Sequence, residues 1–152
     1  MNKEFLYELL DTMSVSGHEI PLQKKVIDRI TPHCDEIRTD CTGNVICVLN
    51  PDAPCKILLA GHADEIGLIF THIQSDGMLR VSRAGGIYPT VYPGHQVVIL
   101  GANGPVYGVV NNYDGLVKEN LHVKELYIDI GAKDEADARQ YVEEGDPVHL
   151  HT

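Results

Sequence analysis

Apolar positions near the start of the chain recur at intervals of three and four residues, which is the spacing of one face of an α-helix. Two such stripes consist of Phe5, Leu6, Leu9, Leu10 and Met13, and of Leu22, Val26, Ile27 and Ile30. The pattern predicts two helices, and Pro32 ends the second because proline cannot donate the hydrogen bond that continues a helix. The "SGHE" stretch predicts a capping box at the second helix, with Ser16 as the N-cap and Glu19 reaching back.

Short apolar runs replace the helical period after residue 34. "EIRTD" and "NVICVL" flank Thr42-Gly43, which predicts a hairpin. "KILLA" at 56–60 is apolar at consecutive positions, and therefore on both faces of an extended chain. Such a strand is typical of a sheet covered by helices on both sides. The first part of the chain therefore predicts a mixed α/β sheet.

After Gly67 the chain shows repeated short strands separated by turn residues. The predicted strands are "GLIFTHI", "MLRVS", "HQVVIL", "PVYGVV" and "LYIDI", followed by a last one beginning at "DPVHLHT". Many short strands with Gly-rich turns indicate a small barrel or sandwich. Before the last strand, residues 133–145 predict one helix, with Asp134 as the N-cap and Gly145 as the C-cap. We place a boundary near residue 68, with the second unit inserted into the first.

Composition and charge narrow the class of protein. Hydrophobic residues make up 43% and charged residues 22%, as in ordinary globular domains. The net charge of −10 and the lack of a Lys/Arg cluster argue against a nucleic-acid partner. No apolar run is long enough to span a bilayer, and the N-terminus does not read as a signal peptide, so we expect no membrane partner and a cytoplasmic location. The four cysteines include no C-x-x-C motif, and we expect them to be reduced and mostly buried.

The strand "KILLA" leads into a cluster of possible ligands in "GHADEIG". A neutral imidazole at His62 suits Zn²⁺ or Co²⁺, and Asp64 could orient the ring or support the metal. The alternative is a His and an Asp in an ordinary polar loop at the end of a strand. Spacing alone leaves both interpretations open, because two residues do not close a coordination shell.

Longer stretches carry a resemblance to a known family. "LLAGHADEIGLIFTHIQSDGMLRVSRAGGIYPTVYPGHQVVI", followed by "GPVYGVV", "KELYIDIGAKDEADAR" and "GDPV", is similar to the tetrahedral and glutamyl aminopeptidases. These are dinuclear metallopeptidases, some of them labelled endoglucanases, and the resemblance runs from the first helices to about Val148. It implies an α/β fold: residues 1–67 would be the N-terminal part of the catalytic domain, and residues 68–152 an inserted small β-barrel.

The resemblance also implies roles for individual residues. His62 matches the first metal ligand, and Asp64 matches the carboxylate that orients that site. In the complete enzymes two divalent ions, Zn²⁺ or Co²⁺, act on peptide substrates, a glutamate elsewhere is the general base, and the barrel makes dimer contacts within large oligomers. The other ligands lie beyond the barrel in the family, and this sequence ends at Thr152. "VVNNYDGLV" also departs from the family pattern. We therefore expect this polypeptide alone to lack peptidase activity.

Other residues have competing interpretations. His149 and His151 could chelate a metal from one face of a strand, but a solvent-facing strand end is favoured for lack of nearby carboxylate or thiolate ligands. Glu65 is expected in a polar or salt-bridged role. Scattered histidines read as structural or surface residues, namely His72, His95 and His122. The second hypothesis for the whole chain is a non-catalytic assembly module that self-associates through the barrel.

Overall fold

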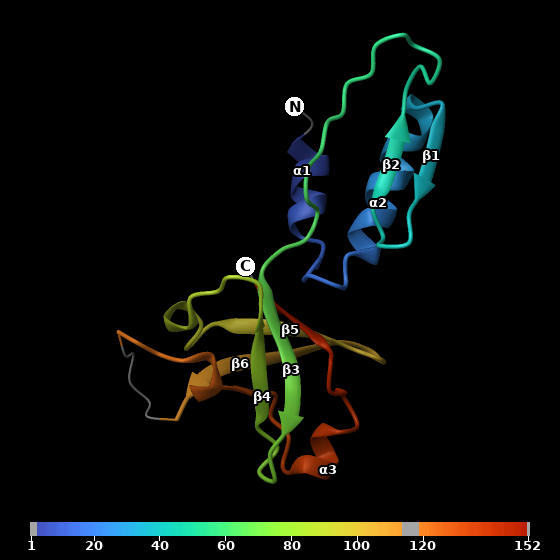
Figure 1. Ribbon diagram of the computed structural model, residues 1–152. Coiled ribbons are helices and arrows are strands. Elements are labelled where there is room, and N and C mark those ends of the chain that lie inside the picture. The colour runs from blue at the N-terminus through green and yellow to red at the C-terminus, as the bar shows by residue number, and fades with distance from the viewer. Residues whose placement is uncertain (1–2, 114–118, 152) are drawn as a thin grey trace. The chain divides into compact units, whose positions relative to one another are not determined.

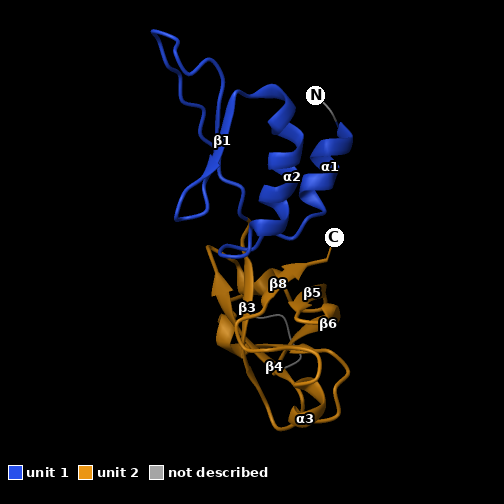
Figure 2. Cartoon of the chain, turned by 90° about the vertical axis from the view of Figure 1, so that its right-hand side faces the viewer, with its two compact units in different colours: residues 1–64 blue, residues 65–152 orange. Residues whose placement is uncertain are grey.

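The computed structural model describes residues 3–113 and 119–151 (Figure 1). The chain divides into two compact units, residues 1–64 and 65–152 (Figure 2). Residues 114–118 lie outside the described part, and they include the last four residues of the atypical "VVNNYDGLV" segment. Within that part, no helix combines the length and the apolar content that crossing a bilayer requires.

The first unit contains two helices and one hairpin, as the sequence predicts. Its elements are α1 (Lys3–Leu10), α2 (Ile20–Ile30), the 3-10 turn η1 (Thr31–His33), β1 (Glu36–Thr39) and β2 (Val45–Val48). The two strands pair antiparallel, with Glu36 opposite Val48 and Thr39 opposite Val45. The α/β class is therefore confirmed for this unit.

The start of α2 differs from the predicted capping box. The helix begins at Ile20, and Glu19 occupies the N-cap position without a side-chain cap. Pro21 lies in the first turn, where the missing N–H of proline costs nothing because helix-starting N–H groups lack partners anyway. The Glu19 carboxylate instead accepts a hydrogen bond from the backbone N–H of Gly17 at 2.7 Å. The Ser16 hydroxyl donates to the side chain of Asp64. The capping-box prediction was wrong.

The hairpin turn depends on one carboxylate. Asp40 accepts hydrogen bonds from the backbone N–H groups of Thr42 and Asn44 at 3.0 and 2.9 Å, and from both of their side chains at 2.9 Å. Gly43 has φ +90°, a left-handed conformation that favours glycine. The side-chain hydrogen bonds of Asn44 and Thr42 lower the pKa of Asp40 from 3.8 to about 2. The ionised carboxylate is thus the form that organises the turn.

We expect Asp40→Ala to destabilise the first unit at neutral pH but not in acid. Because folding lowers the pKa, the contribution of Asp40 is complete above 3.8 and disappears as the pH falls toward about 2. The melting temperature of the variant should lie a few degrees below that of the wild type at pH 7, and the difference should shrink through this window. The exposed Asp52, replaced by alanine, is the matched control. A constant difference down to the lowest pH would contradict the assigned role.

The predicted strand at 56–60 is not formed. Ile57, Leu58 and Leu59 are 83%, 87% and 90% exposed. Among the described residues, no backbone hydrogen bond joins 56–63 to the rest of the chain. The only sheet described in this unit is the β1–β2 pair, so this segment has no neighbouring strand on either side. An apolar strand needs such neighbours because its backbone groups and both faces must be covered.

The cysteines are free, as expected, but less buried than expected. Cys41 and Cys55 are exposed, while Cys34 and Cys47 are half-buried. All four belong to the first unit, where the described sheet has only two strands and offers little interior for them.

The second unit is a closed six-stranded barrel in the order β3-β4-β7-β6-β5-β8 (Figure 1). The strands are β3 (Gly67–Ile73), β4 (Leu79–Ala84), β5 (Gln96–Gly101), β6 (Gly104–Asn112), β7 (Leu126–Asp129) and β8 (Pro147–Leu150). Two further 3-10 turns are η2 (Pro89–Val91) and η3 (Val123–Glu125). Alternate side chains point inward, and the largest fully buried ones include Leu68, Phe70, Ile73, Leu79, Ile99, Leu126 and Ile128. The predicted barrel is confirmed.

The helix predicted at 133–145 is much shorter than expected. It is α3 (Glu135–Ala138), and Asp134 caps it by accepting from the backbone N–H of Asp137 at 2.9 Å, as predicted. The helix ends at Ala138, so the prediction that Gly145 is its C-cap was wrong. The backbone N–H of Gly145 instead donates to Phe70 O at 2.8 Å. This hydrogen bond to β3 ties the segment to the barrel.

Candidate functional site

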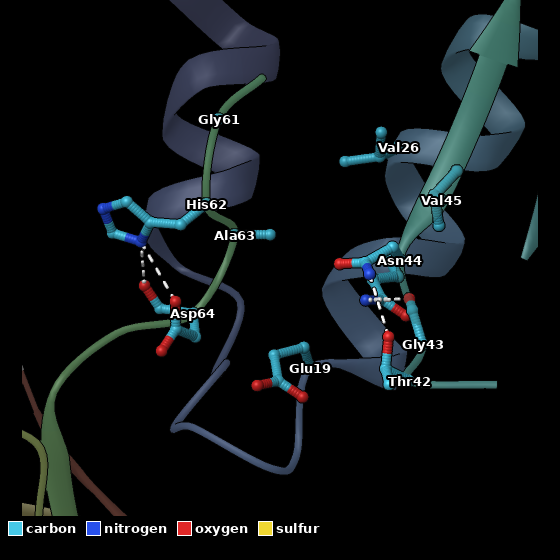
Figure 3. A pocket seen from close by; sticks show the side chains of 11 residues that line it. Glu19, Val26, Thr42, Gly43, Asn44, Val45, Gly61, His62, Ala63 and Asp64 are labelled. Atoms are coloured by element: carbon cyan, nitrogen blue, oxygen red, sulfur yellow. Dashed lines mark hydrogen bonds and ion pairs between the residues drawn. The ribbon is translucent and has the colours of Figure 1, made fainter. Parts of the chain in front are cut away.

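His62 and Asp64 lie in the irregular segment that follows residue 60, and both belong to the first unit. The Nδ1 atom of His62 lies 3.0 Å from the backbone oxygen of Asp64 and 3.0 Å from its Oδ1 (Figure 3). The sequence predicted that these two residues act together, and the structure brings them into contact. It does so through a local turn, since residues 56–60 form no strand.

The two oxygens determine which nitrogen of His62 carries the proton. A carbonyl oxygen and an ionised carboxylate can only accept hydrogen bonds, so Nδ1 must be the donor. In the neutral ring the other nitrogen, Nε2, then keeps its lone pair. The His62 side chain is 85% exposed, so this lone pair is accessible. A carboxylate that fixes the tautomer of a histidine in this way is a common support for metal ligation through the opposite nitrogen.

Asp64 has a second partner that the sequence did not reveal. Its Oδ2 accepts a hydrogen bond from the hydroxyl of Ser16 at 2.5 Å, while its Oδ1 faces His62. The Ser16 hydrogen bond, followed by that of His62, lowers the pKa of Asp64 below 3.8. Asp64 is therefore ionised at neutral pH. Ser16 and Asp64 are separated by 48 positions, and no sequence signal links them.

A polar cavity of about 280 Å³ adjoins the pair. Its walls come from the start of α2, the β1–β2 turn and the segment 61–64 (Figure 3). Glu19, Thr42 and Asn44 line it together with His62 and Asp64. The Gln23 side chain, also at the wall, donates to Gly43 O at 2.6 Å and joins the helix to the turn. The cavity is thus bounded by side chains that are already held by hydrogen bonds.

The donor set fits part of a metal site. A neutral imidazole with a free Nε2 is an ordinary ligand for Zn²⁺ or Co²⁺. Within the described ranges, no group of three or more His, Cys, Asp or Glu side chains is placed to hold a metal ion. These residues therefore supply one imidazole ligand and its supporting carboxylate, and they do not complete a shell.

The other histidines have structural partners. His149 Nδ1 lies 2.8 Å from Glu65 Oε1, which confirms the polar role predicted for Glu65. The His149 side chain is only 16% exposed, so the predicted solvent-facing position was wrong. The reason is a carboxylate that arrives from 84 positions away. His151 packs edge-on against Tyr107, with ring centroids 5.7 Å apart, and among the described residues the two histidines belong to no group of three or more ligand-type side chains.

Two of the scattered histidines have roles of the expected kind. His72 Nδ1 lies 3.5 Å from Glu144 Oε1 at the surface. His122 caps the turn η3 through a reciprocal capping box with Glu125. Both are structural or surface residues, as the sequence suggested.

Comparisons with known proteins agree with one another. The family model described as M42 glutamyl aminopeptidase matches residues 43–152. The lysyl aminopeptidase of Pyrococcus furiosus is 35% identical over 108 residues, which cover 70% of this chain and 31% of that protein. The TET aminopeptidase structure from Thaumarchaeota archaeon SCGC AB-539-E09 matches with a TM-score of 0.91 at 29% sequence identity. The match covers 97% of this chain and 44% of the chain in that structure.

A second solved structure concerns assembly. The TET1 peptidase of Pyrococcus horikoshii, described as assembling into a tetrahedron or a large octahedral shell, matches with a TM-score of 0.86 at 28% identity. The match covers 97% of this chain and 46% of that structure. The chain spans less than half the length of the curated relatives it matches.

Proposed function

The chain belongs to the M42 glutamyl aminopeptidase family, and from that membership we propose that it is the N-terminal portion of a metal-dependent aminopeptidase. The observation that carries this proposal is the geometry of His62. Its Nδ1–H faces Asp64 at 3.0 Å, and its side chain is 85% exposed, which leaves Nε2 accessible beside the polar cavity. In this proposal His62 is a metal ligand and Asp64 holds its ring in the ligating tautomer.

The proposed substrates are peptides, which lose their N-terminal residues. Two divalent ions, Zn²⁺ or Co²⁺, would polarise the scissile carbonyl and acidify a water molecule in the complete enzyme. In this proposal the described residues contribute one metal ligand and the carboxylate that supports it. His62 presents one lone pair, and Asp64 fixes the proton on Nδ1 so that this lone pair stays on Nε2. No general base is assigned to the described residues.

We also propose that the isolated polypeptide is inactive. One imidazole cannot hold two ions, and the described residues contain no larger ligand group. In this proposal, residues 1–67 form the N-terminal part of the catalytic domain and residues 68–152 an inserted barrel that mediates homo-oligomer formation. The assembly described for the Pyrococcus horikoshii relative supports the oligomer.

A second candidate function is a non-catalytic assembly module. It is favoured by the contrast between the closed, well-packed barrel and the single matched ligand in the first unit. The exposed apolar residues at 57–59 offer further surface for association. Metal binding separates the two candidates, because an assembly module without the chemistry needs no metal ligand at His62.

We expect Zn²⁺ to bind weakly to the chain and first at His62. In a titration of isotope-labelled protein, the imidazole signals of His62 should shift at the lowest Zn²⁺ concentrations, and His62→Ala should abolish this first binding event. The physical reason is that His62 combines an exposed ring with a supporting carboxylate.

The control for this titration is His33→Ala, which removes an exposed histidine in η1. It should leave the first binding event unchanged. Binding that persists unchanged in His62→Ala would contradict the proposed ligand.

A further inference from the structure

The segment that carries His62 is held to the first unit by few interactions. Residues 61–63 are exposed, and the described residues provide no backbone hydrogen bond between 56–63 and the rest of the chain. The ring of His62 therefore depends for its orientation on Asp64, with which it shares both of its hydrogen bonds. One of these two acceptors is the backbone oxygen and the other is the carboxylate, so a contact that holds the Asp64 carboxylate also helps to hold the ring.

The Ser16 hydroxyl makes that fixing contact. Ser16 lies in the loop between α1 and α2, and its Oγ donates to Asp64 Oδ2 at 2.5 Å. The other carboxylate oxygen, Oδ1, faces His62 Nδ1 at 3.0 Å. The three side chains thus form one line of hydrogen bonds, in which each carboxylate oxygen has its own donor. A donor on Oδ2 restricts rotation of the carboxylate and keeps Oδ1 directed at the imidazole.

We propose that Ser16 is a positioning residue for His62, acting through the Asp64 carboxylate to keep the imidazole in the tautomer whose Nε2 can bind a metal. This inference rests on the proposed function, which makes His62 a ligand. It extends that function to a residue on a separate loop, and it replaces the helix-capping role that the sequence suggested for Ser16.

The hydroxyl of Ser16 should also affect the metal-free protein. With Ser16 in place, Nδ1 of His62 carries the proton in the neutral ring. Without the hydroxyl, the carboxylate can turn toward water and loses part of its hold on the ring. The proton then redistributes between the two nitrogens, and Nε2 is partly blocked by its own hydrogen. Loss of an outer partner of this kind typically weakens metal binding about 10- to 100-fold.

The experiment measures the tautomer of His62 without any metal. Long-range ¹H–¹⁵N correlation spectra of labelled protein, recorded at a pH where the ring is neutral, distinguish a protonated Nδ1 from a protonated Nε2. The wild type should show the Nδ1–H form. Ser16→Ala should shift His62 toward the Nε2–H form, and Ser16→Thr, which keeps the hydroxyl, should restore the wild-type spectrum.

Thr12→Val is the matched control, because it removes a hydroxyl from the same loop that bonds to Glu8 O and not to Asp64. It should leave the His62 tautomer unchanged. Backbone amide spectra of each variant show whether the first unit remains folded. If Ser16→Ala does not fold, Ser16→Cys, a weaker donor of similar size, should give a partial shift of the tautomer.

The outcomes separate this inference from the proposed function. A wild type in the Nδ1–H form, with Ser16→Ala or Ser16→Cys unchanged, overturns the role of Ser16 and leaves His62 and Asp64 as proposed. A wild type in the Nε2–H form overturns both, because Asp64 would then not orient the ring. A Zn²⁺ affinity of Ser16→Ala equal to that of the wild type also counts against the inference.

Discussion

The purified 152-residue chain, supplied with Zn²⁺ or Co²⁺, is expected to release no amino acid from aminoacyl-anilide substrates. Peptide hydrolysis by a dinuclear site needs both ions held in fixed positions, together with a general base. The described residues provide the imidazole of His62 and no group of three or more ligand-type side chains. The loss relative to a complete enzyme should therefore be essentially total. A spectrophotometric assay of anilide release measures it directly.

The His62→Ala variant, purified in the same way, is the control for this assay because it reports any contaminating host aminopeptidase. Equal background rates in both samples are the expected result. Turnover by the wild-type chain that disappears in His62→Ala would contradict the proposed inactivity. It would show that a second copy or another region completes the site.

Replacing Phe70 by alanine should destabilise the barrel by about 3–5 kcal/mol. Phe70 is fully buried at the centre of β3, and its ring packs within a core contributed by all six strands. Removing the ring reduces the buried apolar surface and leaves a cavity that the side chains of a closed barrel cannot easily fill. Urea unfolding, followed through the amide signals of the barrel strands, measures the change in the free energy of unfolding.

Tyr88→Ala is the matched control, since it removes an aromatic side chain from the same unit that is 77% exposed. We expect its effect to be within about 0.5 kcal/mol, as for most surface substitutions. If both substitutions cost the same, the described barrel core is wrong.

The sequence predicts the barrel well because its strands are defined by local rules. Inward positions alternate with outward ones, as in Val97 and Ile99 on β5, and turn residues mark the ends of the strands. Gly77 shows why the turn signal is reliable. It has φ +84°, and an added Cβ there would lie 2.9 Å from Ala132 O. Glycine is therefore required by both its conformation and the lack of space.

The sequence fails where a partner arrives from a distance. "KILLA" has the composition of a buried strand, but pattern cannot supply the neighbours on which a strand depends. The helix at Asp134 begins as predicted but ends at Ala138, and Gly145 is instead hydrogen-bonded to Phe70, 75 residues away in sequence. The sequence predicts a solvent-facing His149 because its carboxylate partner, Glu65, lies 84 positions away.

At the candidate site, too, local features could be predicted from the sequence and contacts between distant residues could not. The pairing of His62 with Asp64 could be predicted, because two residues separated by one position meet in a local turn. The tautomer could not, since it follows from the distances of both Asp64 oxygens to Nδ1. The contribution of Ser16 could not be predicted either, because the "SGHE" stretch satisfies a helix-capping pattern equally well.

The metal content of the intact chain decides whether its residues form only part of a dinuclear site. Native mass spectrometry of the purified 16.8 kDa protein in excess Zn²⁺ counts the ions retained per chain. We expect at most one weakly held ion, which His62→Ala removes. Two ions retained per chain at that mass, together with turnover of an aminoacyl substrate, would contradict the claim that these residues form only part of the site.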